Sequence, residues 1–174
     1  MKRVLKAIWS KLHVYVLWAL ISAIFWGWIF TLVTDAPDEE RVTLFLYVPE
    51  LRATELDVEL EKSMPEGIRQ VRAHLFSYAL FEEDELLHAD IYVLPGREAV
   101  KMPDTFLPLP EELAQGEGVF RVDGTAFGLP VGRAAASFVS YPPGEDYYLF
   151  FGAYSVHASD GKAIPAAEAF LTLP

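Results

Sequence analysis

One long unbroken apolar run comes first along this chain, and short apolar runs separated by polar turns follow it. The run "VYVLWALISAIFWGWIFTLV" covers residues 14–33 and contains 20 residues without a charge. At a rise of ~1.5 Å per residue, a helix of this length spans ~30 Å, the thickness of the hydrocarbon core of a bilayer. Tryptophan and tyrosine side chains, which favour the membrane interface, are clustered in the same region. The pattern predicts a transmembrane helix over residues 14–33.

A cleaved signal peptide is the alternative interpretation of this run. Its apolar core would span only ~7–15 residues and end at a small-x-small site. Here the run is longer, and Pro37 follows the nearest candidate site, Thr34 to Ala36, and disfavours cleavage. We therefore expect an uncleaved single-pass anchor in the cell membrane. The basic segment 1–13 is expected in the cytoplasm, residues 34–40 form a linker, and residues 41–174 form an extracytoplasmic domain.

Small side chains recur at every fourth position of the predicted helix, which places them on one face. Such a stripe lets two membrane helices approach closely, so it indicates a homodimer or a contact with another membrane protein. The alternative is that small residues are simply common in membrane helices. The helix-packing residues are Ala19, Ala23, Gly27 and Thr31.

The first half of the outer domain alternates between strand-like and helix-like patterns. Residues 42–48 form a continuous apolar run typical of a strand buried on both faces, and residues 68–76 and 90–94 also suit strands. Residues 51–64 indicate a helix, and residues 81–89 one or two helical turns. This β-α-β-α-β order predicts a parallel sheet covered by helices.

The second half contains different signals. Asp123-Gly124 suits the tight turn of a hairpin, residues 147–151 form an aromatic strand, and residues 163–174 form a closing helix. The predicted fold class is therefore α/β, with one N-terminal transmembrane helix followed by a central, mainly parallel sheet, flanking helices and a hairpin.

The order of four motifs suggests a family. "HADIYVLPGREAV", "FLPLPEEL", "RVDGTAFGLPVG" and "YYLFFGAYSVHA" resemble, in sequence, the first lobe of extracellular solute-binding proteins of ABC transporters. The resemblance covers residues 41–174 and implies a single periplasmic-binding-protein-like lobe. Leu129 and Pro130 match the position where that family enters its hinge. Only 15 residues, Gly132 to Asp146, follow before the next strand, so a second lobe does not fit there.

Ligands of open α/β sheets bind beyond the carboxyl ends of parallel strands. The resemblance adds that the turns after the first and third strands contact ligand in that family. The alternative is that these positions are ordinary loop residues. The candidate ligand-binding residues are Tyr47, Pro49, Glu50, Ser77, Tyr78, Pro95, Gly96 and Arg97.

Charge and composition exclude several functions. The net charge is −11, and residues 1–11 carry +4, which leaves −15 for the rest of the chain. This acidic body disfavours nucleic acid and anionic head groups. The sequence contains no cysteine, and we expect no metal and no cofactor. Consecutive acids before His88 and Asp90 indicate a solvated face, and Ser155, His157 and Asp160 indicate a polar loop. The sequence has no recognisable catalytic motif, so we expect that the domain is not an enzyme.

Two functions remain. The first is a non-catalytic membrane-anchored binding or accessory module that engages a transporter or receptor component through exposed aromatic residues such as Phe106, Tyr141 and Tyr147. The alternative is a binder of a small solute, such as a sugar, peptide or amino acid, with an open cleft or one completed by dimerisation. A flat apolar patch would favour the first function, and buried polar groups beyond the strand ends the second.

Overall fold

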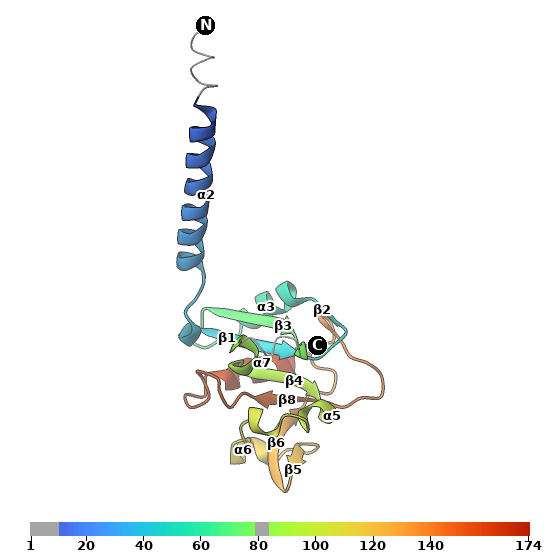
Figure 1. Ribbon diagram of the computed structural model, residues 1–174. Helices are drawn as coiled ribbons and strands as arrows, with labels where there is room; N and C mark the ends of the chain where they lie inside the picture. The colour runs from blue at the N-terminus through green and yellow to red at the C-terminus, as the bar shows by residue number, and fades with distance from the viewer. Residues whose placement is uncertain (1–10, 79–83) are drawn as a thin grey trace. The chain divides into compact units, whose positions relative to one another are not determined.

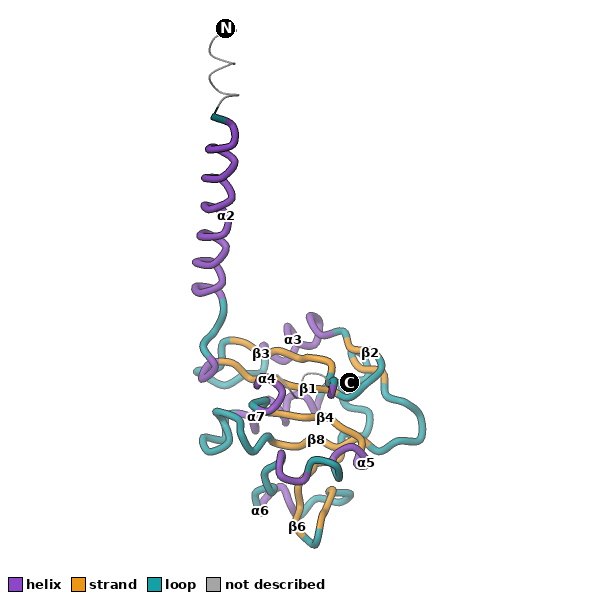
Figure 2. The backbone as a smooth tube through the Cα atoms, viewed as in Figure 1, coloured by secondary structure: helices purple, strands orange, loops and turns teal. Residues whose placement is uncertain are grey.

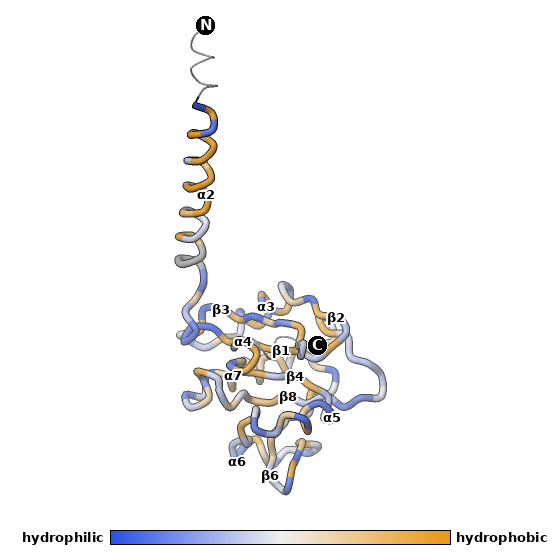
Figure 3. The backbone as a smooth tube through the Cα atoms, viewed as in Figure 1, coloured by the Kyte–Doolittle hydropathy of each residue, from blue (hydrophilic) through white to orange (hydrophobic). Residues whose placement is uncertain are grey.

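In this computed structural model the described residues are 11–78 and 84–174, and the chain divides into two compact units between Ala36 and Pro37. The first unit contains helix α2, Leu12–Thr34, whose apolar character is visible in Figure 3. This helix is long and apolar enough to cross a membrane or to act as a signal anchor, which agrees with the predicted segment 14–33. Ala19, Ala23, Gly27 and Thr31 all lie on α2, but the side chain of Thr31 is not among those described. Helix pairing remains a prediction.

The second unit is built on a six-stranded sheet with the order β3-β1-β4-β8-β6-β5 (Figure 1). The three strands predicted first, β1 Arg41–Leu46, β3 Gln70–Leu75 and β4 Ile91–Pro95, are parallel. Helix α3, Ala53–Glu61, joins β1 to β3, and the short helix α4, Asp84–Leu87, precedes β4. The predicted β-α-β-α-β order is confirmed for the described residues. The predicted helical turns at 81–83 lie outside them.

The prediction of a mainly parallel sheet was wrong. Strand β8, Tyr147–Phe151, runs antiparallel to β4, and the hairpin strands β6, Thr125–Pro130, and β5, Phe120–Val122, continue this antiparallel half. Parallel neighbours need a crossover that returns the chain to the same end of the sheet. The segment between β6 and β8, which contains β7, returns the chain to the end of the sheet where β6 stops, so β8 starts there and runs antiparallel to β6 and β4. The sheet is therefore mixed.

The remaining elements are short except for the closing helix (Figure 2). Strands β2 and β7 pair as a small antiparallel sheet that the sequence did not predict, because each has only two residues. The predicted hairpin turn is confirmed, since Asp123 and Gly124 adopt φ of 50° and 84°. The other elements are η1 Asp38–Glu40, β2 Glu50–Leu51, α5 Gly96–Ala99, η3 Pro103–Thr105, α6 Glu111–Ala114, β7 Val139–Ser140 and α7 Ala163–Thr172.

Alternating side chains give the sheet a hydrophobic cluster on each face. On one face, Val42 and Leu44 of β1 belong to a cluster with α3 and α7, to which α7 contributes Phe170. On the other face, Phe45 belongs to a cluster with Tyr92, Phe150 and residues of the short helices α4 and α5. Near the amino end of this second face, Thr43 of β1 with Arg72 and His74 of β3 line a cavity.

The mixed topology also determines what meets at the carboxyl ends of the parallel strands. Because β8 is antiparallel to β4, its first residue, Tyr147, pairs with Pro95, the last residue of β4. The amino end of β8 and the loop before it therefore join the turns that follow β1, β3 and β4. Four segments distant in sequence contribute side chains to this edge.

Candidate functional site

Aromatic and charged side chains converge at the carboxyl ends of the parallel strands. The ring of Tyr47, after β1, lies 5.6 Å from that of Phe76 and 6.4 Å from that of Tyr78, centroid to centroid. The pairs are tilted or edge-on, which are favourable aromatic geometries. We call this group the carboxyl-end cluster. It consists of Tyr47, Phe76, Tyr78, Arg97, Glu98, Lys101, Glu145 and Tyr147.

Glu98 of α5 is the buried charge of this cluster, with only 5% of the residue exposed. Its Oε2 accepts hydrogen bonds from Lys101 Nζ at 2.7 Å and from the Tyr78 hydroxyl, and Arg97 Nε lies 3.5 Å from Oε1. Lys101 and then Tyr78 lower the pKa of Glu98 below its usual range. Burial, followed by the bond to Glu98, raises the pKa of Tyr78 to about 12. The carboxyl is therefore ionised and the phenol neutral at neutral pH.

Glu145 and Tyr147 add a second polar group beside Glu98. Arg97 Nη1 donates to Glu145 Oε1, whereas Glu145 Oε2 is buried and has no hydrogen-bond partner among the described residues. Burial raises the pKa of Tyr147, and the Glu145 carboxylate raises it further. A buried acceptor without a donor has an energetic cost, which a ligand donor could remove. The cluster thus combines aromatic surface, fixed charges and one unsatisfied acceptor.

The structure brings together some of the residues predicted as ligand-binding and separates others. Tyr47, Tyr78 and Arg97 belong to the carboxyl-end cluster, and the exposed Ser77 adjoins Tyr78. Pro95 is buried at the end of β4. Gly96 packs closely, since a Cβ there would lie 3.0 Å from the Phe120 ring.

Pro49 and Glu50 are exposed on the other side of the first turn. Glu50 belongs to the small β2–β7 sheet and lines a separate cavity of about 390 Å³ together with Arg52 and residues 136–140. Glu50 makes none of the described contacts of the carboxyl-end cluster. A ligand-binding role for these eight residues remains a prediction.

Sequence reasoning missed Glu98, Lys101, Glu145 and Tyr147 as members of a site. The spacing of Glu98 and Lys101, three positions apart, is a recognisable helical ion-pair signal. Glu145 and Tyr147 gave no comparable signal, because they reach this edge only when β8 runs antiparallel. Tertiary topology was required to find them.

The prediction of an exposed aromatic patch for a protein partner was wrong, because the residues named for it are buried or partly buried. Phe106 is 6% exposed and Tyr147 4% exposed, and Tyr141 is partly buried with its hydroxyl donating to the Ala134 carbonyl at 2.9 Å. Leu129 and Pro130 pair with Leu149 and Tyr148 at the end of β6. Their hinge-like role remains a prediction.

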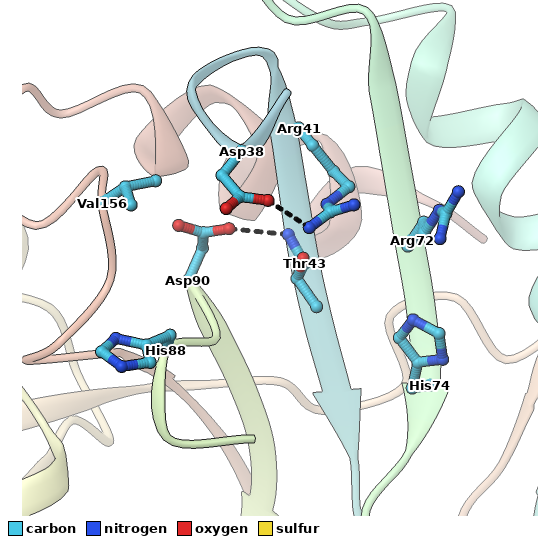
Figure 4. Close-up of a pocket in the computed structure, with 8 residues that line it drawn as sticks. All are labelled: Asp38, Arg41, Thr43, Arg72, His74, His88, Asp90 and Val156. Carbon is cyan, nitrogen blue, oxygen red and sulfur yellow. Dashed lines mark hydrogen bonds and ion pairs between the residues drawn. The ribbon is translucent and has the colours of Figure 1, made fainter. Parts of the chain in front are cut away.

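A cavity of about 390 Å³ lies at the opposite end of the parallel strands (Figure 4). It adjoins the face of the sheet that carries Thr43 of β1, and β3, the start of β1 and the segment before β4 surround it. His74 stacks on Phe45 with ring centroids 5.3 Å apart. We call this space the amino-end cavity, and it is lined by Asp38, Arg41, Thr43, Arg72, His74, His88, Asp90 and Val156.

Ser155 and His157 form a buried network with Asp90, not the polar loop that the sequence suggested. The Ser155 hydroxyl donates to Asp90 Oδ1 and accepts the His157 backbone N–H at 2.8 Å. The His157 ring instead faces Asp160 Oδ2 and the Arg41 carbonyl, each at 3.1 Å. Both ring nitrogens thus face other partners than the serine hydroxyl, which is not the arrangement of a nucleophile with its base. A cavity of about 210 Å³ with mainly apolar walls adjoins this network.

Within residues 11–78 and 84–174, no group of three histidine, aspartate or glutamate side chains is arranged to hold a metal ion.

Comparisons with known proteins give no family match, since no family model matches the sequence, and no curated protein sequence matches it. Among solved structures, the chain is similar to thiaminase I from Bacillus thiaminolyticus, with 17% sequence identity and a TM-score of 0.33. The match covers 52% of this chain and 28% of that chain.

The expectation that the domain is not an enzyme is corrected by this comparison, because thiaminase I is an enzyme. The likeness is too distant to carry an argument about the activity of this chain.

Proposed function

We propose that this chain is a membrane-anchored binding module whose outer domain lies outside the cytoplasm and binds its ligand at the carboxyl-end cluster. The observation that carries the proposal is the convergence of Tyr47, Tyr78, Arg97 and Glu98 from three strand ends, where open α/β sheets bind ligands. The resemblance to the first lobe of solute-binding proteins, together with the parallel order β3-β1-β4, also supports it.

A small polar solute is the occupant that the cluster favours. Phe106 and Tyr147 are buried, so they do not supply the apolar patch expected for a protein partner. Buried polar groups lie beyond the strand ends instead, including the unsatisfied Oε2 of Glu145. A solute with a hydrogen-bond donor for Glu145 and an apolar face for the tyrosine rings fits this chemistry.

The experiment is a thermal-shift screen of the full chain in phosphatidylcholine nanodiscs against amino acids, sugars and short peptides. A ligand that binds the native state raises the melting temperature by mass action. We expect a saturable shift for one class, weakened about tenfold in Tyr78→Phe and Arg97→Gln because each loses a polar contact. Glu50→Gln is the matched control, since Glu50 lies in the other sheet, and its affinity should be unchanged.

Two results would count against this proposal. A saturable shift that Glu50→Gln weakens as much as Tyr78→Phe would move the site away from the cluster. If no class of solute raises the melting temperature of a chain that is shown to be folded, the proposal that the ligand is a small solute is contradicted. The search would then turn to a protein partner, by photocrosslinking from position 78 in native membranes.

A further inference from the structure

The amino-end cavity lies beside the sheet face on which the short helices α4 and α5 pack, among the described residues. The described helix before β4, α4, has only four residues. Side chains at alternate positions on this face, Thr43 of β1 with Arg72 and His74 of β3, line an open space and not a packed interface. Its volume of about 390 Å³ lies in the range of small-ligand sites.

The two carboxylates in the cavity are satisfied by the protein itself. Asp38 forms an ion pair with Arg41 at the entrance to β1. Asp90 is 3% exposed, and one of its oxygens accepts the Thr43 backbone N–H at 2.7 Å (Figure 4). The other oxygen accepts the Ser155 hydroxyl. Burial raises the pKa of Asp90, whereas the bonds from Ser155 and Thr43 act in the opposite direction. Neither acid requires a cation from outside.

Arg41, in contrast, retains capacity for hydrogen bonds. A guanidinium has five N–H donors in a fork that matches phosphate and carboxylate, so the ion pair with Asp38 does not use all the donors of Arg41. His88 Nδ1 lies 2.7 Å from the Tyr154 carbonyl, which only accepts, so Nδ1 carries the hydrogen. The exposed ring can meet a ligand through its second nitrogen, Nε2. Arg72 and His74 complete a lining that is rich in nitrogen-bearing side chains, in an otherwise acidic domain.

We propose that the amino-end cavity is a binding site for a phosphate group, held by Arg41, Arg72, His74 and His88. The site is independent of the carboxyl-end cluster, because it lies at the other end of the same strands. The phosphate belongs either to a free solute or to a lipid head group. The lipid is worth testing because Asp38, which lines the cavity, follows the last residue of α2, Thr34, by only four positions.

The test is calorimetric titration of the full chain in phosphatidylcholine nanodiscs with inorganic phosphate, with the imidazole resonances of His74 and His88 followed by NMR. We expect saturable binding that shifts both resonances. Arg72→Gln and, separately, His88→Gln should weaken it about tenfold and about threefold, as charge-assisted hydrogen bonds are lost. Arg69→Gln is the matched control, because Arg69 is paired with Glu40 at 3.2 Å outside the cavity lining, and its affinity should stay within about twofold.

The source of the phosphate is decided by a second set of nanodiscs made of phosphatidylglycerol without added phosphate. Shifted His74 and His88 resonances in these discs identify a lipid phosphate, whereas unshifted resonances combined with saturable phosphate binding identify a free solute. Melting curves of the variants show whether each is folded. The proposal would be overturned if the folded wild-type chain shows no saturable phosphate binding in the first set and unshifted resonances in the second. Equal weakening by Arg69→Gln and Arg72→Gln would also overturn it.

Discussion

At the scale of single residues, burial separates ion pairs that look alike in sequence. Lys101–Glu98 and Lys62–Glu59 are both spaced three positions apart on a helix or at its end. The Glu98 side chain is 6% exposed, whereas that of Glu59 is 38% exposed. An exposed pair contributes little, but a buried carboxylate that loses its donor has a high cost. The structure therefore predicts that Lys101 contributes more to the stability of the fold than Lys62 does.

We expect Lys101→Met to lower the free energy of unfolding by about 1 kcal/mol at neutral pH, because Glu98 loses a charged donor. The native state lowers the pKa of Glu98, so this stabilisation exists above the unfolded pKa and is lost as pH falls through the native value. Lys62→Met is the control and should cost only a few tenths of 1 kcal/mol. Urea denaturation at pH 7 measures both variants. Equal losses would show that the burial of Glu98 has no energetic effect.

At the scale of elements, helix α3 covers the sheet and also accepts hydrogen bonds from the backbone of its edge strand. Asp57 Oδ1 accepts the Ala73 backbone N–H at 2.7 Å, and Glu61 Oε1 accepts that of Val71 at 3.2 Å. Strand β3 is the edge of the sheet, so these N–H groups would otherwise be open to another strand. Two carboxylates of one helix thus block an edge that could pair with a second molecule.

This arrangement predicts a pH effect on stability. Burial is the main cause that raises the pKa of Asp57 to about 6, so the native state binds a proton more tightly than the unfolded chain. The contribution of Asp57 to stability therefore falls as pH rises from about 4 to about 6. Asp57→Asn keeps an acceptor for Ala73 but does not ionise, and it should remove this part of the pH dependence.

Denaturation of Asp57→Asn and wild type at pH 4.5 and pH 7 checks this expectation. The variant should gain stability relative to wild type at the higher pH. Asp104→Asn, a change at an exposed carboxyl, is the control and should leave the difference between the two pH values unaltered. A variant with the same pH profile as wild type would contradict the raised pKa of Asp57.

At the scale of the whole molecule, the apolar helix and the outer domain are separate units. The second unit, Pro37–Pro174, contains both hydrophobic clusters and the complete six-stranded sheet. A domain that buries its own core does not need a membrane segment for its fold. Its stability should therefore be a property of this unit by itself.

We expect a fragment of residues 37–174 to be soluble and to melt cooperatively at the temperature of the full chain in nanodiscs. Circular dichroism of the two preparations measures this, after subtraction of the signal of a peptide covering residues 1–36. A fragment that aggregates or melts without cooperativity would show that α2 contributes to the fold of the domain.

The sequence by itself determined the features that depend on local patterns. The apolar run was long enough to specify α2 without any tertiary contact, and Asp123-Gly124 specified a turn because both positions tolerate positive φ. A continuous apolar run identified β1, alternation identified β3, and short apolar or aromatic runs ended by turn residues identified β4 and β8.

Only the tertiary structure decided what these elements bring together. The antiparallel direction of β8 depends on where a loop leads, which no local pattern encodes, and it moves Glu145 and Tyr147 to the carboxyl-end cluster. The same packing buries Phe106, which the sequence suggested as exposed. The amino-end cavity likewise collects side chains from β1, β3 and the segments beside them, which are distant in sequence. A site is a property of side chains distant in sequence, so its residues become evident only when the chain is folded.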